Sequence, residues 1–267
     1  MQNLKDKVAV VFAASGEIAG AVARAFAAHG AKVYVTAHRL DAVKALAQEI
    51  KANGGIAEAA KVDALNETEI DNFLKKVVGD NGKLDVVFNG IAVEYSEMGG
   101  RPPALQATFG QFMAPMQKLC GSQFLTSRAA AKYMIESRSE GTVLLLSGAM
   151  SRTKIPNLLG ITAASAGIEG MVRVMAAEWG GEGIKVIGIC PGAIMETKRI
   201  SGWIDDFASE HGIPVDNIVA QYKAFDILKI SPTLKHVAET AAFLASDTGV
   251  VFNSHIVDVD CGKLNML

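Results

Sequence analysis

The alternation of short apolar runs with longer helical segments constrains the fold of this chain more than any other feature. A run that is apolar on both faces is typical of a parallel strand covered by helices on both sides. The segments between the runs have helical periodicity, as in AGAVARAFAAHG (residues 19–30), which ends on a glycine, a common helix terminator. The alternation predicts right-handed crossovers and one doubly wound parallel sheet, which is an α/β fold. The expected strands lie within residues 7–13, 32–37, 84–90, 141–147, 184–190 and 254–260, with a weaker seventh candidate at 56–64.

The chain shows no internal repeat and no linker, so we expect a single domain over residues 1–267. Residues 196–232 interrupt the alternation of strands and helices and are rich in aromatic side chains. Ligands of such sheets bind at the carboxyl ends of the strands, and we expect this segment to form a helical flap over that edge. The aromatic residues of the segment are Trp203, Phe207, Tyr222 and Phe225.

Composition narrows the classes of function. Half of the residues are hydrophobic and a fifth are charged, which suits a large core, and the formal net charge of −2 gives no footprint for nucleic acid. Cys120, Cys190 and Cys261 match no zinc or CxxC spacing, so no metal site is expected and a reduced, cytoplasmic setting is the simplest fit. The apolar run at the N-terminus is too short for a signal peptide, and no run reaches the length that crosses a membrane.

Three stretches carry a family resemblance: AGIEGMVRVMAAEWGGEGIKVIGICPGAIMET (166–197), LLLSGAMS (144–151) and VDVDCGKL (257–264). They closely resemble the short-chain dehydrogenase/reductase superfamily, and the similarity covers nearly the whole chain. The resemblance implies a single-domain Rossmann-type fold of about seven strands with helices on both faces. It also implies hydride transfer to or from NAD(P), with a serine, a tyrosine, a lysine and a relay asparagine at the reacting carbonyl.

Only one of these catalytic residues has its counterpart here. Ser147 matches the family serine, whereas Ile161 occupies the tyrosine position, Ser165 the lysine position, and Leu119 falls near the asparagine position. Isoleucine has no proton to give and serine carries no cation. General acid catalysis contributes roughly a hundred- to ten-thousand-fold, so this loss predicts that the usual chemistry is strongly impaired or is carried out differently.

The cofactor turn departs in the same way. The resemblance implies glycines that shape the turn and admit the pyrophosphate, and FAASGEIAG (12–20) places Ala13, Glu17 and Ala19 at those positions. Alanine at the first position is tolerable only with a negative φ. Glu17 puts a carboxylate at a helix N-terminus, where it would substitute for the anion that such a site attracts and oppose dinucleotide binding. Gly16 and Gly20 remain, so a shifted loop would still leave room.

Other cofactor positions are partly retained. Ala37 stands where an acidic residue would bind a ribose hydroxyl, and the basic residues after it favour NADP(H) over NAD(H). By resemblance, Asp63 contacts the adenine ring, while Asn89 remains from the family's Asn-Asn-Ala-Gly and is followed here by Gly90. The candidate cofactor-binding residues are Ser15, Gly16, Ile18, His38, Arg39, Asp63, Asn89, Pro191, Gly192, Ile194 and Thr197.

Several hypotheses remain open. A replacement proton donor would come from Tyr95, Tyr222, Lys154 or Glu94, which the fold places near the pocket rim. The chain is then an atypical NADP(H)-linked oxidoreductase acting on a small carbonyl or alcohol, a cofactor-independent enzyme on the same scaffold, or a non-catalytic ligand-binding protein. Halohydrin dehalogenases are the family precedent for the second hypothesis, although they retain a tyrosine and an arginine at the positions of Ile161 and Ser165.

The resemblance also implies a homotetramer or homodimer with a seam of four helices. Small residues on the helix that follows Ile161 suit close helix contact. We therefore expect that helix to be retained for packing. The small residues are Ala163, Ala164, Ala166 and Gly167.

Overall fold

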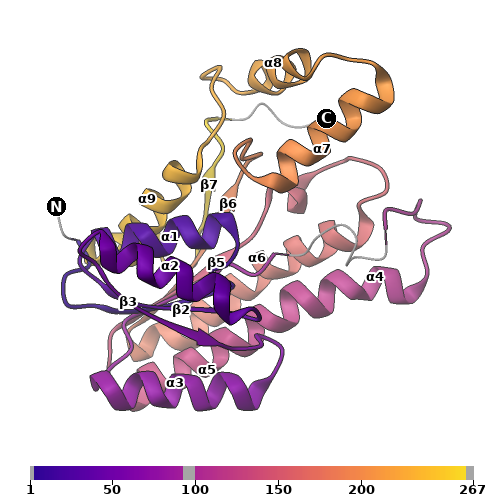
Figure 1. The fold of residues 1–267 in the computed structure, drawn as a ribbon. Helices are drawn as coiled ribbons and strands as arrows, with labels where there is room; N and C mark the ends of the chain where they lie inside the picture. The colour runs from indigo at the N-terminus through magenta and orange to yellow at the C-terminus, as the bar shows by residue number, and fades with distance from the viewer. Residues whose placement is uncertain (1–2, 93–99, 263–267) are drawn as a thin grey trace.

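The computed structural model describes residues 3–92 and 100–262, and in this part of the chain all seven strands join one parallel sheet. Their order is β3-β2-β1-β4-β5-β6-β7, so the direction of winding reverses between β1 and β4. Figure 1 shows the sheet between two layers of helices. The strands are β1 (Val8–Phe12), β2 (Lys32–Ala37), β3 (Ile56–Lys61), β4 (Val86–Asn89), β5 (Gly141–Leu146), β6 (Ile184–Pro191) and β7 (Ile256–Val259). The predicted α/β, Rossmann-type fold is confirmed, including the weak candidate that became β3.

Two hydrophobic clusters fill the two sides of the sheet. One joins α1, α2 and α9 to the sheet, and the other joins α3, α5 and α6 to the opposite face. These helices are α1 (Glu17–Ala28), α2 (Leu40–Ala52), α3 (Glu67–Asn81), α5 (Ser122–Glu136), α6 (Leu159–Trp179) and α9 (Leu234–Ala245). Val11 of β1 and Phe88 of β4 lie in the first cluster, whereas Phe12 and Val87 of the same strands lie in the second. Both strands are therefore apolar on both faces, as their sequences predict.

Local signals set the helix ends. Gly30, with a φ of 95°, follows the last turn of α1 and supplies the left-handed conformation expected of a helix terminator. Asn66 caps α3 by accepting hydrogen bonds from the backbone N–H groups of Thr68 and Glu69. Between α4 (Phe109–Pro115) and α5 the chain passes through a π-helical segment, η2 (Met116–Gly121). Such wide turns are common at functional sites.

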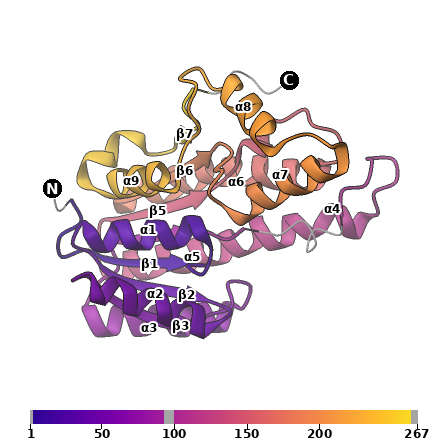
Figure 2. The ribbon, with the colours of Figure 1, turned by 45° about the horizontal axis from the view of Figure 1, so that its top comes forward.

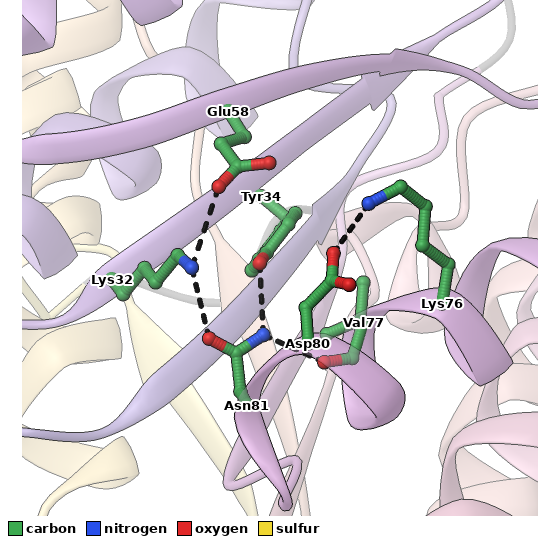
Figure 3. Close-up of polar contacts among 7 residues, drawn as sticks. All are labelled: Lys32, Tyr34, Glu58, Lys76, Val77, Asp80 and Asn81. Atoms are coloured by element: carbon green, nitrogen blue, oxygen red, sulfur yellow. Dashed lines mark hydrogen bonds and ion pairs between the residues drawn. The ribbon is translucent and has the colours of Figure 1, made fainter.

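A polar network joins α3 to the edge of the sheet (Figure 3). Asn81, the last residue of α3, donates to the hydroxyl of Tyr34 at 2.8 Å and accepts from the Lys32 ammonium at 2.9 Å. Lys32 also pairs with Glu58 on β3 at 3.3 Å. The network thus ties one helix to two neighbouring strands, β2 and β3.

Residues 196–232 fold largely as two helices, α7 (Lys198–His211) and α8 (Val215–Phe225). They project beyond the carboxyl ends of β5 and β6 (Figure 2). Ile204, Ala208 and Ile218 form a small hydrophobic cluster of their own there, distinct from the two clusters on the sheet. We call α7 and α8 the flap. Among the described residues, no helix is long and apolar enough to span a lipid bilayer.

Candidate functional site

A cavity of about 270 Å³ lies at the carboxyl ends of β5 and β6, under the flap. Its inner wall comes from α6 and η2, and its outer wall comes from Ile200 and Trp203 of α7 and Tyr222 of α8. Most of the lining side chains are aliphatic, and among the described lining residues the charged groups are Arg101 and Arg199. Both arginines take part in further interactions. The cavity therefore suits a small, largely apolar molecule.

The four catalytic positions predicted by resemblance meet in this cavity. Ser147, Ile161, Ser165 and Leu119 all line it, and all four residues are less than 9 % exposed. The Ser147 hydroxyl donates to the backbone carbonyl of Ser165 at 3.3 Å. The constellation is therefore present in space, but its members offer two neutral hydroxyls and two aliphatic chains. None of the four supplies an acid whose pKa could be tuned toward neutrality.

The four candidate replacement proton donors differ in their position relative to the cavity. Tyr222 lines the cavity from α8, where its ring lies edge-on to Trp203 with 5.9 Å between the ring centroids. Lys154 is exposed and is not among the lining residues. Glu94 and Tyr95 lie outside the described residues.

The turn before α1 corrects one prediction. Ala13 has a φ of 56°, so the positive φ that alanine was expected to avoid is present. The turn is held by two backbone hydrogen bonds, from Ala14 N to Thr36 O at 2.8 Å and from Gly16 N to Ala13 O at 3.0 Å. Left-handed alanine costs roughly 1–2 kcal/mol, which these bonds and the buried Ala14 offset. The turn therefore has a left-handed backbone conformation that is typical of glycine, although the residue there is Ala13.

Ala19 is accommodated by a glycine on the neighbouring strand end. A Cβ added to Gly90 would lie 2.5 Å from the Ala19 Cβ and 2.8 Å from a ring carbon of Phe88. The missing side chain at residue 90 thus provides the room that the Ala19 methyl occupies. Sequence reasoning missed this pairing, because nothing local connects residues 71 positions apart.

Glu17 lies in the first turn of α1, but its carboxylate also contacts a second helix. The N-cap residue of α1 is Gly16, which has no side chain that could cap the helix. Oε2 of Glu17 accepts a hydrogen bond from the backbone N–H of Lys198 at 2.9 Å. Lys198 is the first residue of α7, so the carboxylate caps a helix 181 residues away in sequence.

Two residues predicted at the adenosine end contact each other. His38 Nε2 lies 3.6 Å from Asp63 Oδ1, an ion pair when the imidazole is protonated. Asp63 also accepts from the backbone N–H of Leu65 at 2.9 Å and so acts as a strand-end cap. Arg39 is the N-cap residue of α2 and is exposed, with no side-chain capping bond. Arg39 and His38 are thus neighbours at the end of β2.

Asn89 has a structural task in the described geometry. Its side chain is fully buried, donates to Ser127 Oγ at 3.0 Å and accepts from Thr126 Oγ1 at 2.5 Å. These two bonds hold the buried side chain against α5. Asn89 therefore serves to join β4 to α5.

The residues predicted to flank the nicotinamide line the cavity. Pro191, Gly192, Ile194 and Thr197 all line it, and Ile18 joins them from the start of α1. Thr197 donates from Oγ1 to the backbone carbonyl of Ile194 at 2.8 Å, which fixes the loop between β6 and α7. Ser15 and Gly16 are exposed at the adjoining turn.

The described residues support neither a metal-binding site nor a reactive cysteine thiol. No group of three or more potential ligands is placed to hold a metal ion there. Cys190 is buried and burial raises the pKa of its thiol to about 12, so it is overwhelmingly protonated and inert at neutral pH.

Comparison with known proteins extends the sequence resemblance. A family model described as enoyl-(acyl carrier protein) reductase matches residues 13–263. An uncharacterised oxidoreductase of Bacillus subtilis is 27% identical over 260 residues, which make up 96% of this chain and 37% of that longer protein. Short-chain dehydrogenase reductase 5 of Arabidopsis thaliana is 26% identical over 268 residues, covering 98% of this chain and 95% of the other.

A solved structure supports the fold. A 7α-hydroxysteroid dehydrogenase, complexed with NADH and 7-oxo glycochenodeoxycholic acid, superposes with a TM-score of 0.86. The two chains are 24% identical, and the match covers 100% of this chain and 97% of the other. Together with the sheet order and the cavity, the family match leads to one conclusion: this chain belongs to the short-chain dehydrogenase/reductase superfamily of oxidoreductases, within the family described as enoyl-(acyl carrier protein) reductase.

Proposed function

We propose that the protein is a divergent oxidoreductase that transfers hydride between NADP(H) and a small, largely apolar carbonyl or alcohol compound. The observation that carries this proposal is that Ser147 shares one cavity with Pro191, Gly192, Ile194 and Thr197, the nicotinamide-side residues of the family. A substrate in the cavity would thus meet both a hydroxyl donor and the reacting end of the cofactor.

The residues present fit a dinucleotide with one opposing feature. The N-terminus of α1, beside exposed Ser15 and Gly16, offers backbone N–H groups to a diphosphate. Small Ala37 followed by His38 and Arg39 favours the 2′-phosphate of NADP(H). The opposing feature is the Glu17 carboxylate, because a like charge near the diphosphate lowers its affinity. When bound, the cofactor would supply or accept the hydride.

Ser147 is then the group that orients the substrate oxygen. Its hydroxyl now donates to the Ser165 carbonyl and would turn to donate to a substrate carbonyl instead. The proton needs a source other than Ile161, and Tyr222 is the one phenol among the described lining residues. We therefore assign Tyr222 as the first candidate to hold that proton.

The first experiment is a titration of the purified protein with NADPH and with NADH, followed by protein fluorescence and melting temperature. Trp203 lines the cavity and so reports on its occupancy. A ligand at about a hundred times its Kd adds about 2.7 kcal/mol of stability, which gives a clear thermal shift. We expect saturable binding that is tighter for NADPH, and an Arg39→Ala variant that loses this preference. Absence of binding of either nucleotide at millimolar concentration would overturn the proposal.

The second candidate is a non-catalytic protein that binds a small ligand in the same cavity. It is favoured by the three inert replacements, Leu119, Ile161 and Ser165, which line the cavity together. A screen of carbonyl compounds with NADPH separates the two candidates. Turnover that disappears in Ser147→Ala rejects the non-catalytic candidate, whereas ligand binding without turnover supports it.

A further inference from the structure

Glu17 joins two parts of the molecule that have different tasks. It is the first residue of α1, at the turn where a diphosphate would bind, and its carboxylate accepts from Lys198 N at the start of α7. The first N–H groups of a helix have no partner within the helix, and a carboxylate there is favoured by the helix dipole. The bond is therefore a charge-assisted cap that spans from the cofactor turn to the flap.

The flap has a hydrophobic cluster of its own, so a contact at its start can affect both of its helices. Its helices pack on each other through their own cluster of Ile204, Ala208 and Ile218, and Trp203 stacks on Phe207 with 5.2 Å between the ring centroids. A separate core allows α7 and α8 to move as one unit. The inner side of that unit forms the outer wall of the cavity.

The root of the flap is fixed by a second carboxylate. Glu196 lies just before α7, and its Oε2 accepts from the backbone N–H of Leu234, the first residue of α9. One carboxylate thus holds the root of the flap to α9, while Glu17 holds the start of α7 to the turn. Loss of the Glu17 contact would free the start of α7 while the root stays in place.

We infer that Glu17 is a positioning residue, a latch that holds the flap over the cavity and couples the flap to the charge at the N-terminus of α1. An anion bound at the turn repels the Glu17 carboxylate, weakens its bond to Lys198 and loosens the flap. In the other direction, the latched carboxylate lowers the affinity of the turn for an anion. The coupling to a dinucleotide rests on the proposed function, whereas the latch itself does not.

Two variants separate the hydrogen bond from the charge. Glu17→Gln keeps an oxygen that accepts from Lys198 N but removes the charge, and Glu17→Ala removes both. Asp41→Ala is the control, because Asp41 is also an acidic residue in the first turn of its helix, α2, although it is exposed whereas Glu17 is half-buried. Native-state hydrogen exchange of the amides of residues 198–201 reports the latch without any ligand.

We expect Glu17→Ala to accelerate exchange of these amides at least about tenfold, a factor that corresponds to about 1.4 kcal/mol of local opening. Glu17→Gln is expected to stay within about threefold of the wild type, and Asp41→Ala to leave the rates unchanged. Equal exchange in the wild type and Glu17→Ala, or an equal rise in Asp41→Ala, overturns the latch.

Inorganic diphosphate and NADPH, each titrated by calorimetry, test the coupling. Both Glu17 variants should bind diphosphate about tenfold more tightly than the wild type, because both lack the repelling charge. Diphosphate should also accelerate exchange at residues 198–201 in the wild type but not in Glu17→Ala. Unchanged diphosphate affinity in both variants overturns the coupling. If diphosphate binds Glu17→Gln while NADPH binds none of the proteins, the proposed function fails and the coupling stands.

Discussion

Ala13 shows how a single residue preserves a turn at a cost. Its φ of 56° is disfavoured for alanine by roughly 1–2 kcal/mol, whereas glycine adopts it freely. Glycine also gains more freedom in the unfolded chain, which opposes the benefit by about 0.4–1 kcal/mol. We therefore expect Ala13→Gly to raise the free energy of unfolding by about 0.5–1 kcal/mol in urea denaturation.

The neighbouring residue provides the control. Ala14 is buried and is not among the described non-glycine residues with a positive φ. In Ala14→Gly the unfolded chain gains conformational freedom, but no strained backbone conformation is relieved in the folded state. The substitution should therefore lower the free energy of unfolding by about 0.5–1 kcal/mol. If both variants shift stability in the same direction, strain at Ala13 is not the cause.

Ala19 and Gly90 form a complementary pair. Gly90→Ala would place its methyl 2.5 Å from the Ala19 Cβ, and overpacking of this kind typically costs 1–3 kcal/mol, so a loss of about 2 kcal/mol is expected. Ala19→Gly in the same chain should recover part of that loss. Recovery should be incomplete, because the new methyl still lies 2.8 Å from Phe88.

A double-mutant cycle in urea measures this coupling. Gly79→Ala serves as the control, since a Cβ at this exposed position in α3 meets nothing within 4 Å. Removing a glycine from a helix interior should raise stability by roughly 0.5–1 kcal/mol. An additive cycle, with no interaction energy between residues 19 and 90, would show that the two positions are independent.

At the scale of elements, α3 depends on the network in Figure 3. Asn81→Ala removes the donor to Tyr34 and the acceptor of Lys32, and leaves the partly buried Tyr34 hydroxyl without this partner. We expect a loss of about 1–2 kcal/mol in the free energy of unfolding, because stranded polar groups lose their water as well as their partner. Thermal denaturation of the variant measures it.

A second ion pair of α3, also drawn in Figure 3, provides the control for Asn81→Ala. Lys76 pairs with Asp80 one turn apart, and the Lys76 side chain is 65% exposed. Exposed pairs of this kind contribute roughly 0.3–0.5 kcal/mol, so Lys76→Ala should change stability by no more than that. An equal loss in both variants would mean that general changes in α3, rather than its connection to β2 and β3, account for the effect.

At the scale of the whole molecule, assembly remains a prediction. The small residues expected at a subunit seam pack partly within the protomer: Ala164 is fully buried, and a Cβ at Gly167 would lie 3.1 Å from the sulfur of Cys120. Larger apolar side chains are exposed on α6 and on the preceding helix, α5: Val174 of α6 is 57% exposed and Phe124 of α5 is 42% exposed. These larger side chains are better candidates for contact between subunits.

We expect Phe124→Glu and Val174→Glu to shift the protein toward monomers in size-exclusion chromatography with light scattering. A charge introduced into an apolar two-fold interface is repeated on both subunits, which increases its effect. Ile56→Glu is the control, because Ile56 is 59% exposed on β3 at the far edge of the sheet. A seam elsewhere is indicated if only the control dissociates, and a wild type that is monomeric at all concentrations excludes the assembly.

The sequence by itself determined the sheet and the helices, and the family resemblance implied that Ser147, Ile161, Ser165 and Leu119 belong to one site. Apolar periodicity and strand-end position are local properties, and the carboxyl ends of parallel strands necessarily share an edge. Only the tertiary structure decided what Ala13, Glu17 and Gly90 do. The turn at Ala13 depends on the bond from Ala14 N to Thr36 O, Glu17 on Lys198 N, and Gly90 on the Ala19 methyl. No local rule specifies which distant backbone group or methyl a residue will meet. Such contacts are decided when the layers pack, because the shape of the packed elements determines which polar groups face each other and which side chains have room.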